Sequence, residues 1–163
     1  MPGYKAHISF AGFWYCIVLF IVCRLYDPST LFLLELAFCI MLGALFPDID
    51  IKSKGQKYIY TGFFIGAIPL LLMKQYILVA FAGWLCCIPM MVKHRGIFHD
   101  PLYMSFFIVV SWYVLYLYYP IRAIQYIWHF ICFIIGMHSH MLLDYGVMRY
   151  VKKLTKHKKK KFK

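Results

Sequence analysis

LFLLELAFCIMLGALF, residues 31–46, is a run of sixteen residues in which only Glu35 carries a charge. A helix on a soluble protein keeps one polar face, so a run that is apolar on every face indicates a helix inside a membrane. Similar runs occupy residues 8–23, 58–73, 76–92, 102–119 and 124–143. The composition agrees, because 63% of the residues are hydrophobic and only 15% are charged. The sequence therefore predicts an all-α, polytopic membrane protein.

The sequence fits two different numbers of membrane crossings. Six runs predict about six helices in one membrane-embedded domain, residues 1–150, followed by a basic tail, residues 151–163. Several runs have only about 16 or 17 residues, and a helix of about 25 Å is shorter than a hydrocarbon core of about 30 Å. The third and fourth runs therefore fit either two full spans or a shallow helical hairpin between four spans.

The basic residues predict the orientation in the membrane. With an even number of crossings, both termini and every second connection lie on the same side. That side receives most of the basic residues of the connections and the lysine-rich tail, and the other side receives only Arg24, Lys74 and Arg122. Positively charged connections normally face the cytoplasm, so we expect both termini there. The tail is expected to bind anionic lipid headgroups.

Most acidic and histidine residues lie at the predicted cytoplasmic ends of the helices. Ionisable side chains at membrane depth are costly unless they have partners, and imidazoles together with carboxylates are ligands for divalent metals. The sequence therefore predicts a metal site at these helix ends. The residues concerned are His7, Asp48, Asp50, His94, His99, Asp100, His138, His140 and Asp144.

The spacing within the last run supports this interpretation only in part. His140 and Asp144 are four residues apart, so on a helix they share one face and can hold a metal together. The same spacing suits a hydrogen-bonded structural pair. His138 precedes His140 by two residues, about 200° around the helix, and is predicted to contact other parts of the protein.

The segment LFPDID, residues 45–50, carries the next pair of candidate ligands. Proline disfavours helical geometry in the residue before it, so Pro47 is predicted to end the preceding helix. Asp48 and Asp50 would then lie in extended chain and point the same way. They fit either a shared cation or a solvated turn with Lys52 and Lys54 as counterions.

The segment KHRGIFHD, residues 93–100, separates two apolar runs. Gly96 interrupts a regular helix, so a bent loop could turn both His94 and His99 inward. The guanidinium of Arg95 matches the geometry of phosphate oxygens, and it also fits an ordinary cytoplasmic anchor.

Four motifs carry a resemblance to a known family. KAHISF, LFPDID followed by S-x-G-Q, HRGIFH and GMHSHMLLD are similar in order and spacing to the YdjM-like bacterial inner-membrane proteins, which are regarded as metal-dependent hydrolases. That family in turn resembles zinc-dependent phospholipase C and P1 nuclease, all-helical enzymes that cleave phosphate esters with a zinc cluster. The sequence departs from the family pattern in two places. Phe98 and Asp100 replace the threonine and serine usual in the family's loop, and Asp144 is followed by Tyr145-Gly146 instead of the usual run that leads to a threonine.

The resemblance implies a ligand set and a reaction. The implied metal ligands are His7, Asp48, Asp50, His94, His99, His140 and Asp144. Since seven ligands exceed the four of one tetrahedral zinc, two or three ions are expected, with manganese or iron as other metals that suit the donors. Asp48, Asp50 and Arg95 are the expected catalytic residues. The expected function is hydrolysis of a phospholipid or lipid-linked phosphate by a metal-activated water at the bacterial inner membrane; nucleic acid is not an expected partner.

Two other classes of function also fit the sequence. A divalent metal-ion transporter would use intramembrane His and Asp ligands, although nearer the bilayer midplane. A noncatalytic scaffold would need only the membrane domain and its basic tail. Glu35 is a further candidate for function because it lies inside a predicted span, but no partner for it is evident in the sequence.

Overall fold

The computed structural model describes the chain apart from residues 1–2, 51–53, 77–78, 81–82, 84–98 and 160–163. The described elements are all helices, and the described residues contain no strand, so the all-α prediction is confirmed. They are α1 (Tyr4–Leu25), α2 (Thr30–Leu45), the 3-10 helix η1 (Phe46–Asp50), α3 (Lys54–Leu72), α5 (Pro101–Tyr118), α6 (Pro120–Gln125) and α7 (Ile127–Lys159). The predicted run at 76–92 lies mostly outside the described residues.

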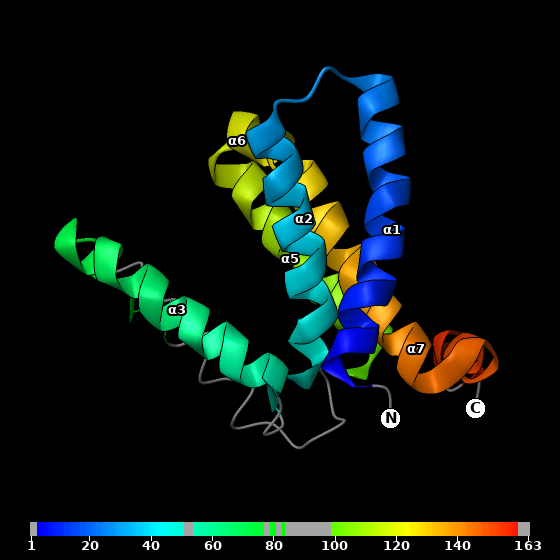
Figure 1. Cartoon of the computed structure of the whole chain (residues 1–163). Helices are drawn as coiled ribbons and strands as arrows, with labels where there is room; N and C mark the ends of the chain where they lie inside the picture. Colours follow the sequence, from blue (N-terminus) through cyan, green and yellow to red (C-terminus); the bar gives the residue numbers. More distant parts are fainter. Residues whose placement is uncertain (1–2, 51–53, 77–78, 81–82, 84–98, 160–163) are drawn as a thin grey trace.

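Among the described residues, four helical stretches are long and apolar enough to cross a membrane. They are Tyr4–Leu25, Thr30–Ile49, Pro101–Tyr118 and Ile127–Thr155. The helix α3 is not among them, and it extends away from the bundle of the other helices (Figure 1). The part of the chain that the structure describes therefore holds four candidate spans, and the choice between four and six crossings stays open because the run at 76–92 lies mostly outside it. Large apolar side chains such as Phe20, Leu34 and Phe106 are exposed on the bundle, as expected of a surface that faces lipid.

Local sequence signals explain where several helices begin. The helix α2 begins after Ser29, whose hydroxyl accepts a hydrogen bond from the backbone N–H of Phe32 at 3.2 Å. The helix α5 begins with Pro101, and the Asp100 carboxylate accepts from the backbone N–H groups of Leu102 and Tyr103 at 3.0 and 3.4 Å. The carboxylate that departs from the family pattern at position 100 therefore caps a helix.

The prediction that Pro47 leads into extended chain is wrong. Phe46 keeps helical dihedral angles, and the chain continues as η1 through Asp50. Proline is tolerated in the first turn of a helix, where its missing N–H has no partner to lose. A 3-10 helix has three residues per turn, so the argument that the carboxylates of Asp48 and Asp50 point the same way does not hold.

Two glycines allow α2 and α7 to pack closely. A Cβ atom added at Gly136 would lie 2.0 Å from the backbone oxygen of Ile40, and one added at Gly43 would lie 2.2 Å from that of Phe133. Small residues at helix contacts in membranes bring backbones close enough for extensive van der Waals packing. This contact sets the distance between the C-terminal end of α2 and the part of α7 that carries His140.

The helices of the bundle alternate in direction. Figure 1 shows the N-terminus, η1 and the bend in α7 at the same end of the bundle, and the α1–α2 connection at the other. The bend in α7 occurs at Gly146, whose φ of 67° and ψ of 157° are accessible to glycine and strained for other residues. Residues from the start of α1, from η1 and from the part of α7 near its bend can therefore meet.

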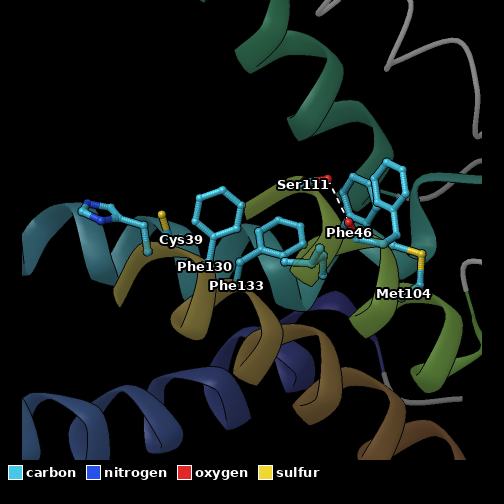
Figure 2. Close-up of a pocket in the computed structure, with 9 residues that line it drawn as sticks. Cys39, Phe46, Met104, Ser111, Phe130 and Phe133 are labelled. Atoms are coloured by element: carbon cyan, nitrogen blue, oxygen red, sulfur yellow. Dashed lines mark hydrogen bonds between the residues drawn. The ribbon is translucent and has the colours of Figure 1, made fainter. Parts of the chain in front are cut away.

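A cleft lies among α2, α5 and α7 (Figure 2). Its volume is about 290 Å³. The described residues that line it are Cys39, Phe46, Met104, Phe107, Ile108, Ser111, His129, Phe130 and Phe133. The cleft is thus walled almost entirely by apolar side chains.

Candidate metal centre

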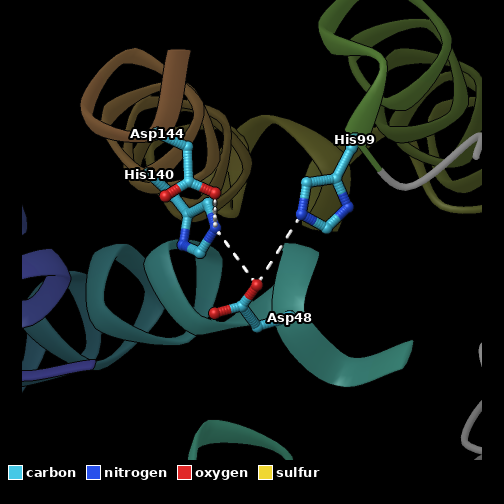
Figure 3. Close-up of side chains that lie close together, drawn as sticks. All are labelled: Asp48, His99, His140 and Asp144. Atoms are coloured by element: carbon cyan, nitrogen blue, oxygen red, sulfur yellow. Dashed lines mark ion pairs between the residues drawn. The ribbon is translucent and has the colours of Figure 1, made fainter. Parts of the chain in front are cut away.

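Four side chains meet at the end of the bundle that holds η1. They are Asp48 from η1, His99 from the turn before α5, and His140 and Asp144 from α7 (Figure 3). Each offers one ligand atom, and these four atoms all lie within 4.8 Å of one another. His99 and His140 are almost fully buried, with 1% of each side chain exposed. The sequence segments that carry them are up to 96 residues apart, so only the fold assembles this group.

The distances within the group are compatible with a metal site. Nε2 of His140 lies 3.5 Å from Oδ1 of Asp48 and 3.5 Å from Oδ2 of Asp144, and Nε2 of His99 lies 3.6 Å from Oδ1 of Asp48. Hydrogen bonds between nitrogen and oxygen are usually about 2.9–3.0 Å long. Ligands about 2.0–2.2 Å from a tetrahedral ion are separated by about 3.3–3.6 Å. These three distances match the separation of ligands around one ion, and the whole group lies within 4.8 Å, so the four residues could hold a metal.

The ring of His140 is held in the orientation that metal binding needs. Its Nδ1–H donates a hydrogen bond to the backbone oxygen of Ala44 at 2.7 Å. A histidine that donates from one ring nitrogen to a carbonyl presents the lone pair of the other nitrogen to a metal. Nε2 of His140 is buried and makes no hydrogen bond among the described residues. The close α2–α7 contact thus selects the tautomer.

His99 is positioned through its backbone. Its carbonyl oxygen accepts hydrogen bonds from Nζ of Lys153 at 2.5 Å and from the hydroxyl of Tyr145 at 3.2 Å. Lys153 also donates to the Tyr145 hydroxyl at 2.9 Å and lies 4.4 Å from the centre of the tyrosine ring. These contacts come from both sides of the bend at Gly146. The last part of α7 therefore holds the turn that presents His99.

His7 lies beside the group of four. Its Nε2 is 3.5 Å from Oδ1 of Asp144, and its ring stacks on that of His140 with centres 3.9 Å apart. Asp144 thus presents one oxygen to His7 and the other to His140. A carboxylate in this arrangement is suited to bridging two ions.

The remaining predicted site residues either lie away from the group or fall outside the residues that the structure describes. His94 and Arg95 fall outside the described residues. Asp50 ends η1, and its side chain is outside the described part. His138 points away from the group, as predicted, and is hydrogen-bonded to Ser105 at 2.8 Å and to Tyr150.

Sequence reasoning missed two features of the structure. Lys153 was assigned only to the basic tail, although it contacts the turn of His99. Glu35 had no evident partner, but Nε2 of His129 donates to its carboxylate at 3.0 Å. Glu35 and His129 are both ionisable residues within apolar runs, and this property could have indicated in the sequence that they pair. The sequence separation of 94 residues concealed the contact.

Replacing Lys153 with methionine tests its role as a positioning residue. The change keeps a long side chain but removes the charged donor to the His99 carbonyl. Loss of a group that orients a metal ligand typically weakens metal binding by about 10–100-fold, so we expect a loss of about tenfold. A competition titration with a zinc chelator measures it. Lys152→Met is the matched control, because Lys152 is exposed. The zinc affinity of the Lys152→Met protein should be unchanged. Equal affinity in the Lys153→Met protein would contradict the assignment.

The described part of the chain is that of a polytopic membrane protein with a candidate metal centre at its helix ends. A family model described as YdjM inner membrane protein matches residues 7–150. The chain therefore belongs to the YdjM inner membrane protein family. No curated protein and no solved structure matches it. The matched segment begins at His7 and includes all four residues of the candidate centre.

Proposed function

We propose that this protein is a membrane-bound metal-dependent hydrolase that cleaves a phosphate ester of a membrane lipid. The observation that carries the proposal is the group of two histidines and two aspartates, whose ligand atoms lie within 4.8 Å of one another and could hold a metal ion. A bound divalent ion would supply Lewis acidity and an activated water. His99 and His140 would hold the first ion with Asp48 and Asp144, and His7 with the second oxygen of Asp144 would contribute to another.

The nature of the donors limits the choice of metal. Imidazole nitrogens with carboxylate oxygens suit zinc, and they also suit manganese and iron. Zinc is our choice, because two nitrogens and two oxygens match its common tetrahedral sites and the resemblance to phospholipase C and P1 nuclease points the same way.

Asp48 is the group best suited to accept a proton. Its side chain is 20% exposed, whereas that of Asp144 is 5% exposed. A general base must reach both the reacting water and the solvent that removes the proton. Asp144 would orient His7 and His140, and Arg95 is the proposed contact for phosphate oxygens.

The location of the group favours a lipid substrate. Asp48 lies in η1, directly after α2, and Asp144 lies two residues before the bend in α7, so both belong to the end of the bundle rather than to its middle. A lipid phosphate at the membrane surface could reach such a site while its chains stay in the bilayer. We further propose that this end of the bundle and both termini face the cytoplasm, because the basic residues are in excess on this side of the predicted topology.

Replacing Asp48 with asparagine tests the reaction. The amide keeps the shape of the side chain but cannot take up a proton and lacks the charge of a carboxylate metal ligand, so phosphoesterase turnover should fall by about a hundredfold or more. The assay follows the two products of phosphodiester hydrolysis, such as diacylglycerol and the phosphorylated headgroup, in phospholipid vesicles treated with the purified, zinc-loaded protein. Asp27→Asn is the control, because Asp27 is exposed in the connection at the opposite end of the bundle. Full turnover in the Asp48→Asn protein would overturn the proposed role.

Divalent metal transport is the second candidate, and one observation favours it. The Glu35–His129 pair gives α2 and α7 a second His–carboxylate contact, and Glu35 lies thirteen residues from Asp48, about 20 Å along a helix. Transport requires polar groups at more than one depth in the membrane. Zinc flux into proteoliposomes that depends on Asp48 and Glu35, without any turnover of phosphate esters, would favour transport over hydrolysis.

A further inference from the structure

The cleft among α2, α5 and α7 has walls that suit a hydrocarbon chain. Four of its lining residues are phenylalanines, and the others are mostly aliphatic or sulfur-containing. The hydroxyl of Ser111 donates to the backbone oxygen of Phe107 at 2.8 Å, and Nε2 of His129 donates to Glu35. The polar groups of these lining residues are therefore largely engaged within the protein. A polar ligand would lose its hydrogen bonds to water without finding replacements.

One end of the cleft is lined by residues that are close in sequence to members of the candidate metal centre. Phe46 precedes Asp48 by two residues, and Met104 follows His99 by five. From Phe46 the wall extends back along α2 to Cys39, a distance of seven residues or about 10 Å along a helix. Figure 2 shows Cys39 and Phe46 toward opposite ends of the row of side chains. From the end nearer the metal centre, the cleft thus runs alongside the membrane-spanning helices α2, α5 and α7.

We propose that this cleft holds one acyl chain of a glycerophospholipid whose phosphate lies at the metal centre. This inference rests on the proposed function, and it adds the part of the substrate that the protein recognises. The helices that form the cleft are candidate spans of an inner-membrane protein, so the molecules that surround them are phospholipids. The volume of about 290 Å³ suits a single chain rather than a whole lipid.

The cleft contributes selectivity more than affinity. Lipid chains are as apolar as the walls, so the hydrophobic effect does not favour the cleft over the bilayer. What the cleft adds is van der Waals packing along one chain, which holds the ester bond at a constant position relative to Asp48. A substrate without a chain would lack this alignment.

Replacing Ser111 with tryptophan should block the cleft. Ser111 is exposed and its hydroxyl contacts only its own helix among the described residues, so the substitution breaks no known contact between helices. The indole would occupy the space of the chain. Val110→Trp is the matched control, because Val110 is the exposed neighbour on the same helix and does not line the cleft.

Photocrosslinking tests occupancy without relying on activity. The intact protein is placed in vesicles that contain phosphatidylglycerol with a diazirine midway along one acyl chain, and the labelled residues are mapped by mass spectrometry. Labelling should concentrate on Phe107 and Phe130, and Ser111→Trp should lower it there by about tenfold while Val110→Trp leaves it unchanged. Labelling spread evenly over lipid-facing residues such as Phe106, or labelling by a polyisoprenyl phosphate probe alone, would overturn the proposal.

Turnover provides the second measurement. The ratio of turnover on dipalmitoyl phosphatidylglycerol to turnover on bis-p-nitrophenyl phosphate should fall by about tenfold in the Ser111→Trp protein. An unchanged ratio would overturn the acyl-chain proposal and leave the hydrolase intact. If neither compound is hydrolysed by the unaltered protein, the proposed function fails, and the crosslinking pattern still decides whether the cleft binds an acyl chain.

Discussion

The His140→Ala protein should lose its bound metal. His140 contributes the nitrogen that lies 3.5 Å from both Asp48 and Asp144, so its removal takes away a ligand at the centre of the group. Loss of a group that only orients a ligand costs about 10–100-fold in affinity, and loss of the ligand itself should cost at least about a hundredfold. Elemental analysis of protein purified in detergent measures the metal content.

His138→Ala is the matched control for this experiment. His138 lies on the same helix but is hydrogen-bonded to Ser105 and Tyr150 instead of facing the group. Its removal should leave the metal content unchanged. Circular dichroism should show the same helical content in both variants, which separates loss of a ligand from loss of the fold. Full metal content in the His140→Ala protein would exclude His140 as a ligand and remove the main support for the proposed reaction.

Gly136→Val should destabilise the protein strongly. A Cβ at this position would lie 2.0 Å from the backbone oxygen of Ile40 and 2.9 Å from the backbone nitrogen of Ala44, so α2 and α7 would have to separate. Overpacking of a tight contact usually costs about 1–3 kcal/mol, and a clash with backbone atoms belongs at the upper end, about 3 kcal/mol. Unfolding by denaturant in detergent micelles measures the loss.

The same variant should also bind metal less tightly. Separation of the helices lengthens the hydrogen bond from His140 to the Ala44 oxygen, which orients the imidazole. Gly12→Ala is the control, because a Cβ added at Gly12 in α1 meets nothing within 4 Å. Alanine favours a helix by up to about 1 kcal/mol over glycine, so this control should be neutral or slightly stabilising. A Gly136→Val protein as stable as the unaltered one would show that the close α2–α7 contact is not required.

Much of the architecture could be predicted because the bilayer constrains the chain. A continuous apolar run such as residues 31–46 has one stable form in a membrane, since a helix satisfies its own backbone hydrogen bonds. Alternating crossings then place His7, Asp48, His99 and His140 at one end. The prediction that these residues lie at one end of the bundle needed only the order of the runs.

The errors arose where local rules competed with tertiary contacts. Pro47 was expected to end the preceding helix and lead into extended chain; α2 does end at Leu45, but the chain continues as the 3-10 helix η1, which carries Asp48 to the two histidines. The partner of Glu35 depends on the packing of α2 against α7, which glycines at positions 43 and 136 allow. No local pattern reports which residues of two distant helices will face each other.

The sequence by itself determined the class of protein, the helical segments, the family and the set of ionisable residues at one end of the bundle. Those properties follow from composition, run length and order along the chain. Only the tertiary structure decided which of the candidates share one site, because ligand geometry depends on distances of a few ångströms between segments far apart in sequence. It placed Asp48, His99, His140 and Asp144 together, turned His138 away, and bent α7 at Gly146 so that Lys153 contacts the turn of His99.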